Sequence, residues 1–89
     1  MPSIDLVISN KLGLHARAAA KLTQLASQYK SDVFIIRDEQ KVNAKSIMGV
    51  MMLAAGLGVQ VTIEAVGEDA PQALSAIQEL FQNKFGEEH

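Results

Sequence analysis

The spacing of apolar residues switches between two repeats along the chain, and the order of these switches most constrains its fold. A repeat of two residues is typical of strands, and a repeat of three to four is typical of helices. Alternation and β-branched clusters predict strands over residues 4–8, 33–36, 41–44 and 59–65. Apolar stripes and a serine cap predict helices over residues 16–29, 47–53 and 70–85. The resulting β-α-β-β-α-β-α order, with short links, predicts an α+β domain with one sheet and helices on a single face.

Local features add expectations about how these segments begin, end and pack. Asp38-Glu39-Gln40 predicts a hairpin turn, and Asp69 with Pro71 predicts the start of the last helix. The apolar run Val33-Phe34-Ile35-Ile36 predicts a strand buried on both faces. Residues 86–89, at the end of the chain, are predicted to fray.

The composition limits the kinds of site that the chain can form. Its 89 residues predict a single domain over 1–89, and the absence of cysteine excludes disulfides and thiolate zinc sites. With two histidines, a histidine-based metal centre is poorly supported, so we expect neither metal nor cofactor. The net charge of −2, the scattered Lys and Arg and the few aromatic residues argue against nucleic-acid binding.

The sequence carries no recognisable signal for export or for a membrane. The N-terminal residues lack the basic and apolar regions of a secretory signal. The longest apolar run, residues 47–57, is too short to span a bilayer and is interrupted by glycines. We therefore expect a cytoplasmic protein without membrane insertion.

His15 is the first candidate for chemistry, because it lies between the first strand and the first predicted helix. A helix start presents unpaired backbone N–H groups and the positive end of a dipole, which favour an anion such as phosphate. Gly13 lets the backbone turn sharply before the histidine, and small Ala side chains leave the helix start open. An imidazole there can act as a nucleophile, and Arg17 can pair with phosphate oxygens. The combination predicts phosphate carried on a histidine.

A complete enzyme site is not evident around His15. No Asp or Glu lies close in sequence to orient the ring, although a distant one could do so in the fold. The chain has no nucleophile elbow, and Gly56-Leu57-Gly58 lacks the third glycine of a dinucleotide loop. We expect a carrier of a phosphoryl group rather than a stand-alone enzyme.

Ser46, directly before the short predicted helix, is a second candidate site. Its hydroxyl can cap that helix, and it could also be phosphorylated, since a dianion is tolerated at a helix start. The helix then carries Ile47, Met48, Met51 and Met52, more large apolar residues than one buried stripe needs. We expect Met48 and Met51 to be partly exposed, and we predict that partners dock on Ile47, Met48 and Met51, the docking patch.

The segments around both candidate sites form two longer motifs. The first is Asn10-Lys11-Leu12-Gly13-Leu14-His15-Ala16-Arg17, and the second is Lys45-Ser46-Ile47-Met48-Gly49-Val50-Met51. The first resembles the active-histidine signature, and the second the regulatory-serine segment, of HPr. This family comprises the histidine-containing phosphocarrier proteins of the phosphoenolpyruvate-dependent sugar phosphotransferase system. The resemblance covers almost the whole chain, and two motifs at this spacing are far more specific than either alone.

The resemblance implies an open-faced β-sandwich, in which three helices cover one face of a four-stranded antiparallel sheet. It implies that His15 takes phosphate on Nδ1 from phosphorylated enzyme I and passes it to an enzyme IIA component. Arg17 would assist, with the backbone N–H groups of Ala16 and Arg17 holding the phosphate. In many relatives a dedicated HPr kinase/phosphorylase modifies the serine that corresponds to Ser46. We expect the carrier to be a monomer.

The sequence departs from the family at one position. The family usually has proline where this chain has Ala18, and we expect alanine to keep the helix and the function.

Two alternative functions are also considered. The nitrogen-related paralogue NPr is similar to HPr in its fold and in its histidine. Acidic tails such as Glu87-Glu88 occur in NPr-like chains, but the Ser46 segment favours HPr. The other alternative is a purely regulatory module read through phosphorylated Ser46, and the His15–Arg17 pair argues against it.

Overall fold

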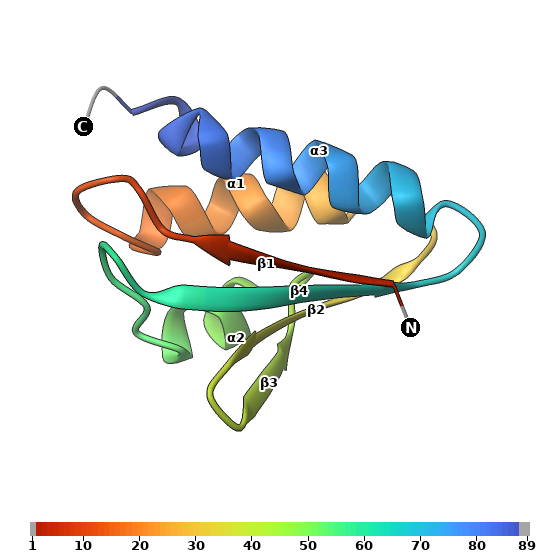
Figure 1. The fold of residues 1–89 in the computed structure, drawn as a ribbon, viewed down its shortest axis with the longest axis horizontal. Helices are drawn as coiled ribbons and strands as arrows, with labels where there is room; N and C mark the ends of the chain where they lie inside the picture. The colour runs from red at the N-terminus through yellow and green to blue at the C-terminus, as the bar shows by residue number, and fades with distance from the viewer. Residues whose placement is uncertain (1, 88–89) are drawn as a thin grey trace.

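The computed structural model describes residues 2–87, and its elements follow the predicted order (Figure 1). They are β1 (Ser3–Val7), α1 (Ala16–Ala26), β2 (Asp32–Arg37), β3 (Gln40–Asn43), α2 (Ile47–Met52), β4 (Gln60–Val66), α3 (Ala70–Gln82) and a 3-10 turn, η1 (Lys84–Gly86). Figure 1 shows α1 and α3 side by side along the sheet, and the two helices contact each other. The predicted α+β class is confirmed.

The described strands form one antiparallel sheet in the order β1-β4-β2-β3. The register places one apolar row across all four strands, made by Ile4, Ile63, Ile35 and Val42. This row faces the helices, because Ile63 and Ile35 are fully buried in the core. The open-faced, four-stranded architecture implied by the resemblance is confirmed.

The helices bury their apolar side chains against this face of the sheet. α3 contacts β1 and β4, while α2 packs against α1 and β3. Leu22 of α1, Val50 of α2 and Ile77 of α3 are each fully buried. Removing such a side chain from water contributes about 1.5–3 kcal/mol, so each helix is held to the sheet mainly by its apolar stripe.

The prediction that residues 33–36 are buried on both faces is wrong. Val33 and Ile35 are fully buried, whereas Phe34 and Ile36 are half-buried because the helices cover one face alone. On the open face the Lys41 ammonium lies 4.6 Å from the centre of the Phe34 ring, a cation–π contact. A long charged side chain thus shields apolar surface that lacks a second layer.

Several boundaries differ from the predictions by one to three residues. α1 ends at Ala26 and does not extend to residue 29, and α3 ends at Gln82 and does not extend to residue 85. The hairpin turn consists of Asp38 and Glu39, because Gln40 already pairs with Arg37 in the ladder between β2 and β3. Asp38 itself has a φ of +54°, so the tight turn is made by a residue in the left-handed region.

Asp69 begins α3, as predicted, but its carboxylate binds another loop. It accepts hydrogen bonds from the backbone N–H groups of Lys30 and Ser31, at 2.8 and 2.9 Å, and from the Ser31 hydroxyl. The hydroxyl bond, followed by the Lys30 bond, holds the pKa of Asp69 below its ordinary value of 3.8. The start of α3 is therefore tied to the loop that follows α1.

The prediction that the chain frays from residue 86 is wrong for Gly86 and Glu87. After α3, the turn η1 brings the chain back against α1, with Phe85 fully buried. The backbone N–H groups of Gly86 and Glu87 donate hydrogen bonds into this turn, at 2.9 and 3.0 Å. A buried aromatic ring thus anchors the segment, and residues 88–89 lie outside the described residues.

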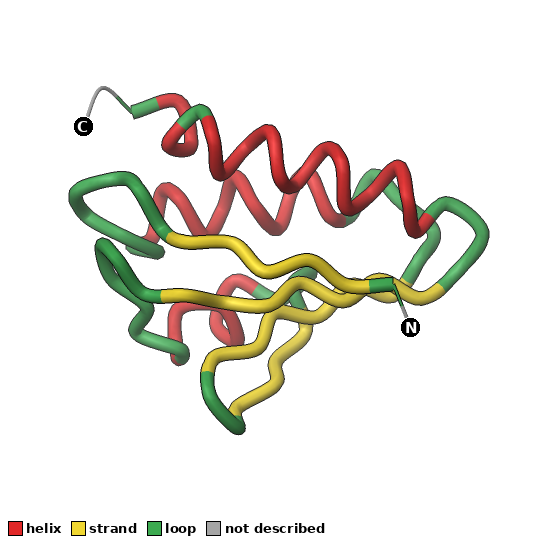
Figure 2. The backbone as a smooth tube through the Cα atoms, viewed as in Figure 1, coloured by secondary structure: helices red, strands yellow, loops and turns green. Residues whose placement is uncertain are grey.

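Three segments distant in sequence meet at one end of the molecule. Figure 2 shows the loop between β1 and α1 beside the loop between α2 and β4, with the C-terminal turn at the same end. The N–H of Leu14 donates a hydrogen bond to the carbonyl oxygen of Ala55 at 2.9 Å. The N–H of Gly58 donates a hydrogen bond to the carbonyl oxygen of Ile8 at 2.8 Å. This end of the fold carries His15.

Candidate functional site

His15 lies at the N-terminus of α1, where the sequence places it. It is the N-cap residue, with an extended backbone (φ −74°, ψ 179°), and its carbonyl oxygen accepts from the Ala19 N–H at 2.8 Å. Within residues 2–87, no side chain caps this end and the first turn holds no acidic residue. The N–H groups of Ala16 and Arg17 are therefore left for solvent or for an anion, at the positive end of the helix dipole.

Gly13 is needed because the chain turns tightly before His15 and passes close to a second loop. Its φ of +66° is in the left-handed region, and a Cβ atom would lie 2.6 Å from both the Ala55 carbonyl oxygen and the Gly56 Cα. The close approach also lets the Leu14 N–H reach the Ala55 oxygen. Backbone contacts between two loops thus fix the segment that carries His15.

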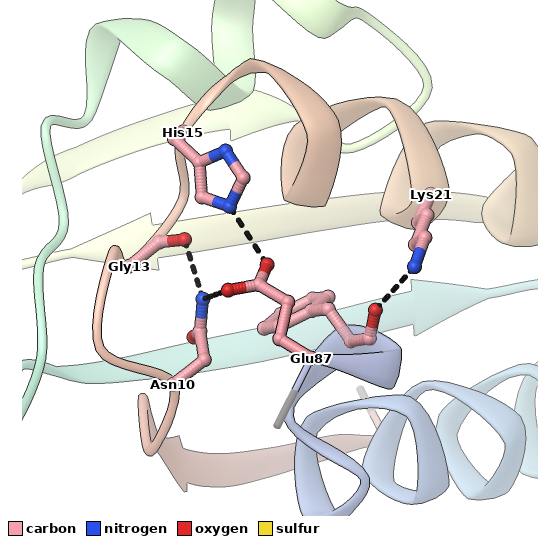
Figure 3. A network of polar contacts seen from close by, with 6 residues as sticks. Asn10, Gly13, His15, Lys21 and Glu87 are labelled. Atoms are coloured by element: carbon pink, nitrogen blue, oxygen red, sulfur yellow. Dashed lines mark hydrogen bonds and ion pairs between the residues drawn. The ribbon is translucent and has the colours of Figure 1, made fainter. Parts of the chain in front are cut away.

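An acidic side chain from the end of the chain contacts the ring of His15. Oε2 of Glu87 lies 2.7 Å from Nε2 of His15 (Figure 3). The side chain of Glu87 is 14% exposed and that of His15 is 28% exposed. The other oxygen of Glu87, Oε1, accepts a hydrogen bond from Nδ2 of Asn10 at 3.3 Å. Asn10 is fully buried, and its Nδ2 also donates to the Gly13 carbonyl oxygen at 2.8 Å. Glu87 is thus held between the ring and the loop that positions the ring.

The charge of Glu87 decides which ring nitrogen carries hydrogen in this contact. The hydrogen bond from His15 holds the pKa of Glu87 below its ordinary value of 4.5. Burial raises this pKa, whereas the hydrogen bond from Asn10 and the positive charges of His15 and Lys21 lower it further. An ionised carboxylate has no proton to donate, so Nε2 of His15 is the donor. In the neutral ring Nδ1 then keeps its lone pair, and it points away from Glu87 (Figure 3).

Sequence reasoning does not identify Glu87 as the partner of His15, although it allows for a distant carboxylate. The two residues are 72 positions apart, and the C-terminal turn brings them together. The one local signal is Phe85, an aromatic residue beyond the last helical stripe, whose burial anchors the turn.

Arg17 occupies the first turn of α1, and its side chain is exposed. Within the described residues its guanidinium takes part in no ion pair, so the structure does not bring it to Glu87. A guanidinium free of carboxylates can pair with an anion at the helix end that His15 occupies.

Ser46 is the N-cap of α2, as the sequence predicts. Its Oγ accepts a hydrogen bond from the Gly49 N–H at 3.2 Å, and its carbonyl oxygen accepts from the Val50 N–H at 3.0 Å. Caps of this kind contribute about 1 kcal/mol. The hydroxyl therefore has a structural role in the unmodified protein.

The residues of the docking patch are exposed. Met48 is 69% exposed, Ile47 42% and Met51 39%, which confirms the exposure predicted for the two methionines. Val50, on the opposite side of α2, is fully buried. Met52, at 66%, extends the apolar surface beyond the patch.

Two exposed leucines near His15 are missed by the sequence pattern. Leu12 is 67% exposed in the loop before α1, and Leu57 is 59% exposed in the loop before β4. These two loops are joined by the hydrogen bond from Leu14 to Ala55. A leucine in a loop belongs to no repeat, so nothing in the pattern indicates whether it is buried.

Two other kinds of feature are absent from the part of the chain that the structure describes. No group of three or more His, Cys, Asp or Glu side chains in residues 2–87 is arranged to hold a metal ion. No helix in the same range is both long enough and apolar enough to cross a bilayer.

Comparison with known proteins identifies the family. A family model described as "PTS HPr component phosphorylation site" matches residues 2–83. Phosphocarrier protein HPr of Cupriavidus necator is 58% identical over 83 residues, which cover 93% of each chain. Phosphocarrier protein NPr of Shewanella violacea is 46% identical over 83 residues, covering 93% of this chain and 91% of that protein.

A solved structure agrees with these sequence relatives. The crystal structure of HPr from Thermoanaerobacter tengcongensis superposes with a TM-score of 0.96, at 45% identity and with 100% of both chains covered. Sequence and fold thus lead to the same family over nearly the full length of the chain. The chain belongs to the HPr family of phosphocarrier proteins of the phosphotransferase system.

Proposed function

We propose that this chain accepts a phosphoryl group on Nδ1 of His15 from phosphorylated enzyme I and passes it to enzyme IIA components of the sugar phosphotransferase system. One observation carries the proposal: the ring of His15 stands at the open N-terminus of α1, and Glu87 engages Nε2 rather than Nδ1. The free amides of the helix and the exposed Arg17 supply positive charge for a phosphoryl group. Membership of the family supports the same role.

In the transfer step, the lone pair of Nδ1 forms a bond to phosphorus. The bond between phosphorus and the donor atom of enzyme I breaks, and its electron pair stays on the donor. The N–H groups of Ala16 and Arg17, together with the Arg17 guanidinium, bind the phosphoryl oxygens during the exchange. The same exchange in reverse transfers the group to a IIA component, so the chain is a carrier rather than a stand-alone enzyme.

Both partners must reach the same nitrogen, so we propose that they bind one surface formed by His15, Arg17 and the docking patch. The contact between α2, which carries the patch, and α1, which His15 precedes, supports a shared surface. Exposed methionines suit a surface that meets two different partners, because the Met side chain is flexible and polarizable. We further expect the carrier to act as a monomer in the cytoplasm.

Ser46 is proposed as a regulatory site for an HPr kinase/phosphorylase. Phosphate on Oγ would lie at the start of α2, where negative charge is tolerated, so the helix is expected to persist. The added charge would stand directly before Ile47 and Met48 of the docking patch. Docking of an apolar partner surface would then be weakened.

An NPr-type carrier of the nitrogen-related branch is the second candidate, and the similarity to the Shewanella NPr favours it. The motif around Ser46 favours HPr. Transfer from the phosphorylated chain to purified IIA proteins of both branches separates the two, since each carrier is expected to prefer the acceptor of its own branch.

Phosphorylation by phosphoenolpyruvate and enzyme I is the deciding experiment. We expect an acid-labile, alkali-stable phosphate in the wild type and in Ser46→Ala, and none in His15→Ala. ATP with the kinase should label the wild type and His15→Ala but not Ser46→Ala. Label that appears only with ATP and the kinase would contradict the carrier function and support a purely regulatory module.

A further inference from the structure

The turn that carries Glu87 has an unusual backbone. Lys84, Phe85 and Gly86 are consecutive residues with φ values of +55°, +57° and +77°. Residues other than glycine rarely adopt this left-handed region, because Cβ crowds the backbone there. Such a conformation persists only where the surrounding structure enforces it, and segments of this kind cluster at functional sites.

Contacts on both sides of the turn hold it in place. Phe85 is fully buried, and its ring centre lies 4.8 Å from that of Phe81 in α3. The Lys21 ammonium, from α1, donates to the Phe85 carbonyl oxygen at 2.6 Å (Figure 3). The turn is therefore fastened to the helix that begins at His15, and the chain leaves it with Glu87 against the ring.

We propose that Glu87 is a positioning residue, whose carboxylate holds the His15 ring in one orientation with hydrogen on Nε2, so that the Nδ1 lone pair faces the incoming phosphorus. This role rests on the proposed function. The buried Asn10 holds the second carboxylate oxygen, so the carboxylate is fixed from two sides. In other active sites and metal sites, a carboxylate that accepts a hydrogen bond from one ring nitrogen of a histidine fixes the tautomer and the orientation of the ring.

The contact also suits the charge that develops during transfer. When Nδ1 forms its bond to phosphorus, positive charge spreads over the ring, while the bond to the donor breaks and its electron pair stays on the donor. The hydrogen remains on Nε2 throughout, and its hydrogen bond to Glu87 becomes stronger as the ring becomes more positive. In the handover to an acceptor, the ring with hydrogen still on Nε2 leaves with the electron pair of the breaking N–P bond.

The test measures the tautomer of the His15 ring by nitrogen NMR of the 89-residue chain. The variants are made in a His89→Gln background, so that His15 is the only histidine. In the neutral ring, we expect the wild type to show an Nε2 that carries hydrogen and an Nδ1 that does not. Glu87→Leu should move both signals toward a mixture of tautomers. Gly86→Ala should move them in the same direction, since a Cβ there would lie 3.0 Å from Lys21 Nζ and the φ is left-handed. Glu79→Gln, an exposed carboxylate of α3, is the matched control and should change neither signal.

A kinetic measurement completes the test. Glu87→Leu should accept phosphate from phosphorylated enzyme I about tenfold more slowly in kcat, with little change in KM, while Glu79→Gln matches the wild type. Glu87→Asp should recover part of the rate and of the wild-type spectrum. Signals or rates that are the same in Glu87→Leu and the wild type overturn the role of Glu87 alone. A wild type that enzyme I never phosphorylates overturns the proposed function instead, and the NMR result does not depend on it.

Discussion

Nε2 of His15 and Oε2 of Glu87 lie 2.7 Å apart, although 72 positions separate the two residues in the sequence. The contact joins the N-cap residue of α1 to the last described residue of the chain. It leaves Nδ1 as the ring nitrogen available to a partner. Conditions that change the charge of Glu87 are therefore expected to change both the stability of the fold and the orientation and tautomer of the His15 ring.

The lowered pKa of Glu87 predicts a pH-dependent part of the stability. Because the folded pKa lies below the ordinary 4.5, this part is fully present above that value and is lost as the pH falls through the folded pKa. We expect the difference in free energy of unfolding between the wild type and Glu87→Gln to shrink as the pH falls below 4.5. Urea denaturation at a series of pH values measures it. A difference that stays constant across that range would show that the ionised carboxylate makes no favourable contact in the fold.

Gly13→Ala is expected to lower the free energy of unfolding by about 1–3 kcal/mol, because the residue has a left-handed φ and no room for a Cβ. Gly56→Ala, in the loop that faces Gly13, is the control, since a Cβ there meets nothing within 4 Å. Urea denaturation of both variants gives the comparison. Equal stabilities would mean that the two loops do not approach each other as closely as described.

Ala18→Pro is expected to raise the free energy of unfolding by about 0.4–1 kcal/mol and to leave phosphoryl transfer intact. Proline restricts the unfolded chain, and the first turn of α1 does not need the N–H that proline lacks. Ala20→Pro, deeper in the same helix, should instead lose about 3 kcal/mol or more. Melting temperatures report both changes. An Ala18→Pro chain that melts at or below the wild-type temperature would show that the local backbone differs from that of the family.

Met48→Glu is expected to weaken transfer both from enzyme I and to IIA components, because it places a charge in the centre of an apolar surface. The effect should appear as a higher KM for each partner, measured in separate transfer assays. Val66→Glu is a matched control, since Val66 is 39% exposed on a strand outside the docking patch. If Met48→Glu leaves both transfers unchanged, the shared docking surface is refuted.

Much of the fold follows from patterns within short segments. The alternation at Val61, Ile63 and Ala65 places β4, and the cap at Ser46 places the start of α2, because strand faces and helix caps depend on neighbours a few residues away. The same local logic identifies His15 at the start of α1. Burial is less local, since Phe34 looks like a core residue in sequence and becomes half-buried because the sheet has one covered face.

The sequence by itself determined which segments are helices and strands, where α1 begins, and that a histidine and an arginine stand at that helix end. Only the tertiary structure decided that Glu87 meets His15, that Asn10 holds the other carboxylate oxygen, and that Gly86 and Glu87 pack in a turn where fraying was predicted. The reason is physical: periodicity and capping depend on residues within about one turn of one another. The position of the carboxylate depends instead on the burial of Phe85 and on a left-handed turn held against another helix, contacts that exist only after the layers have packed.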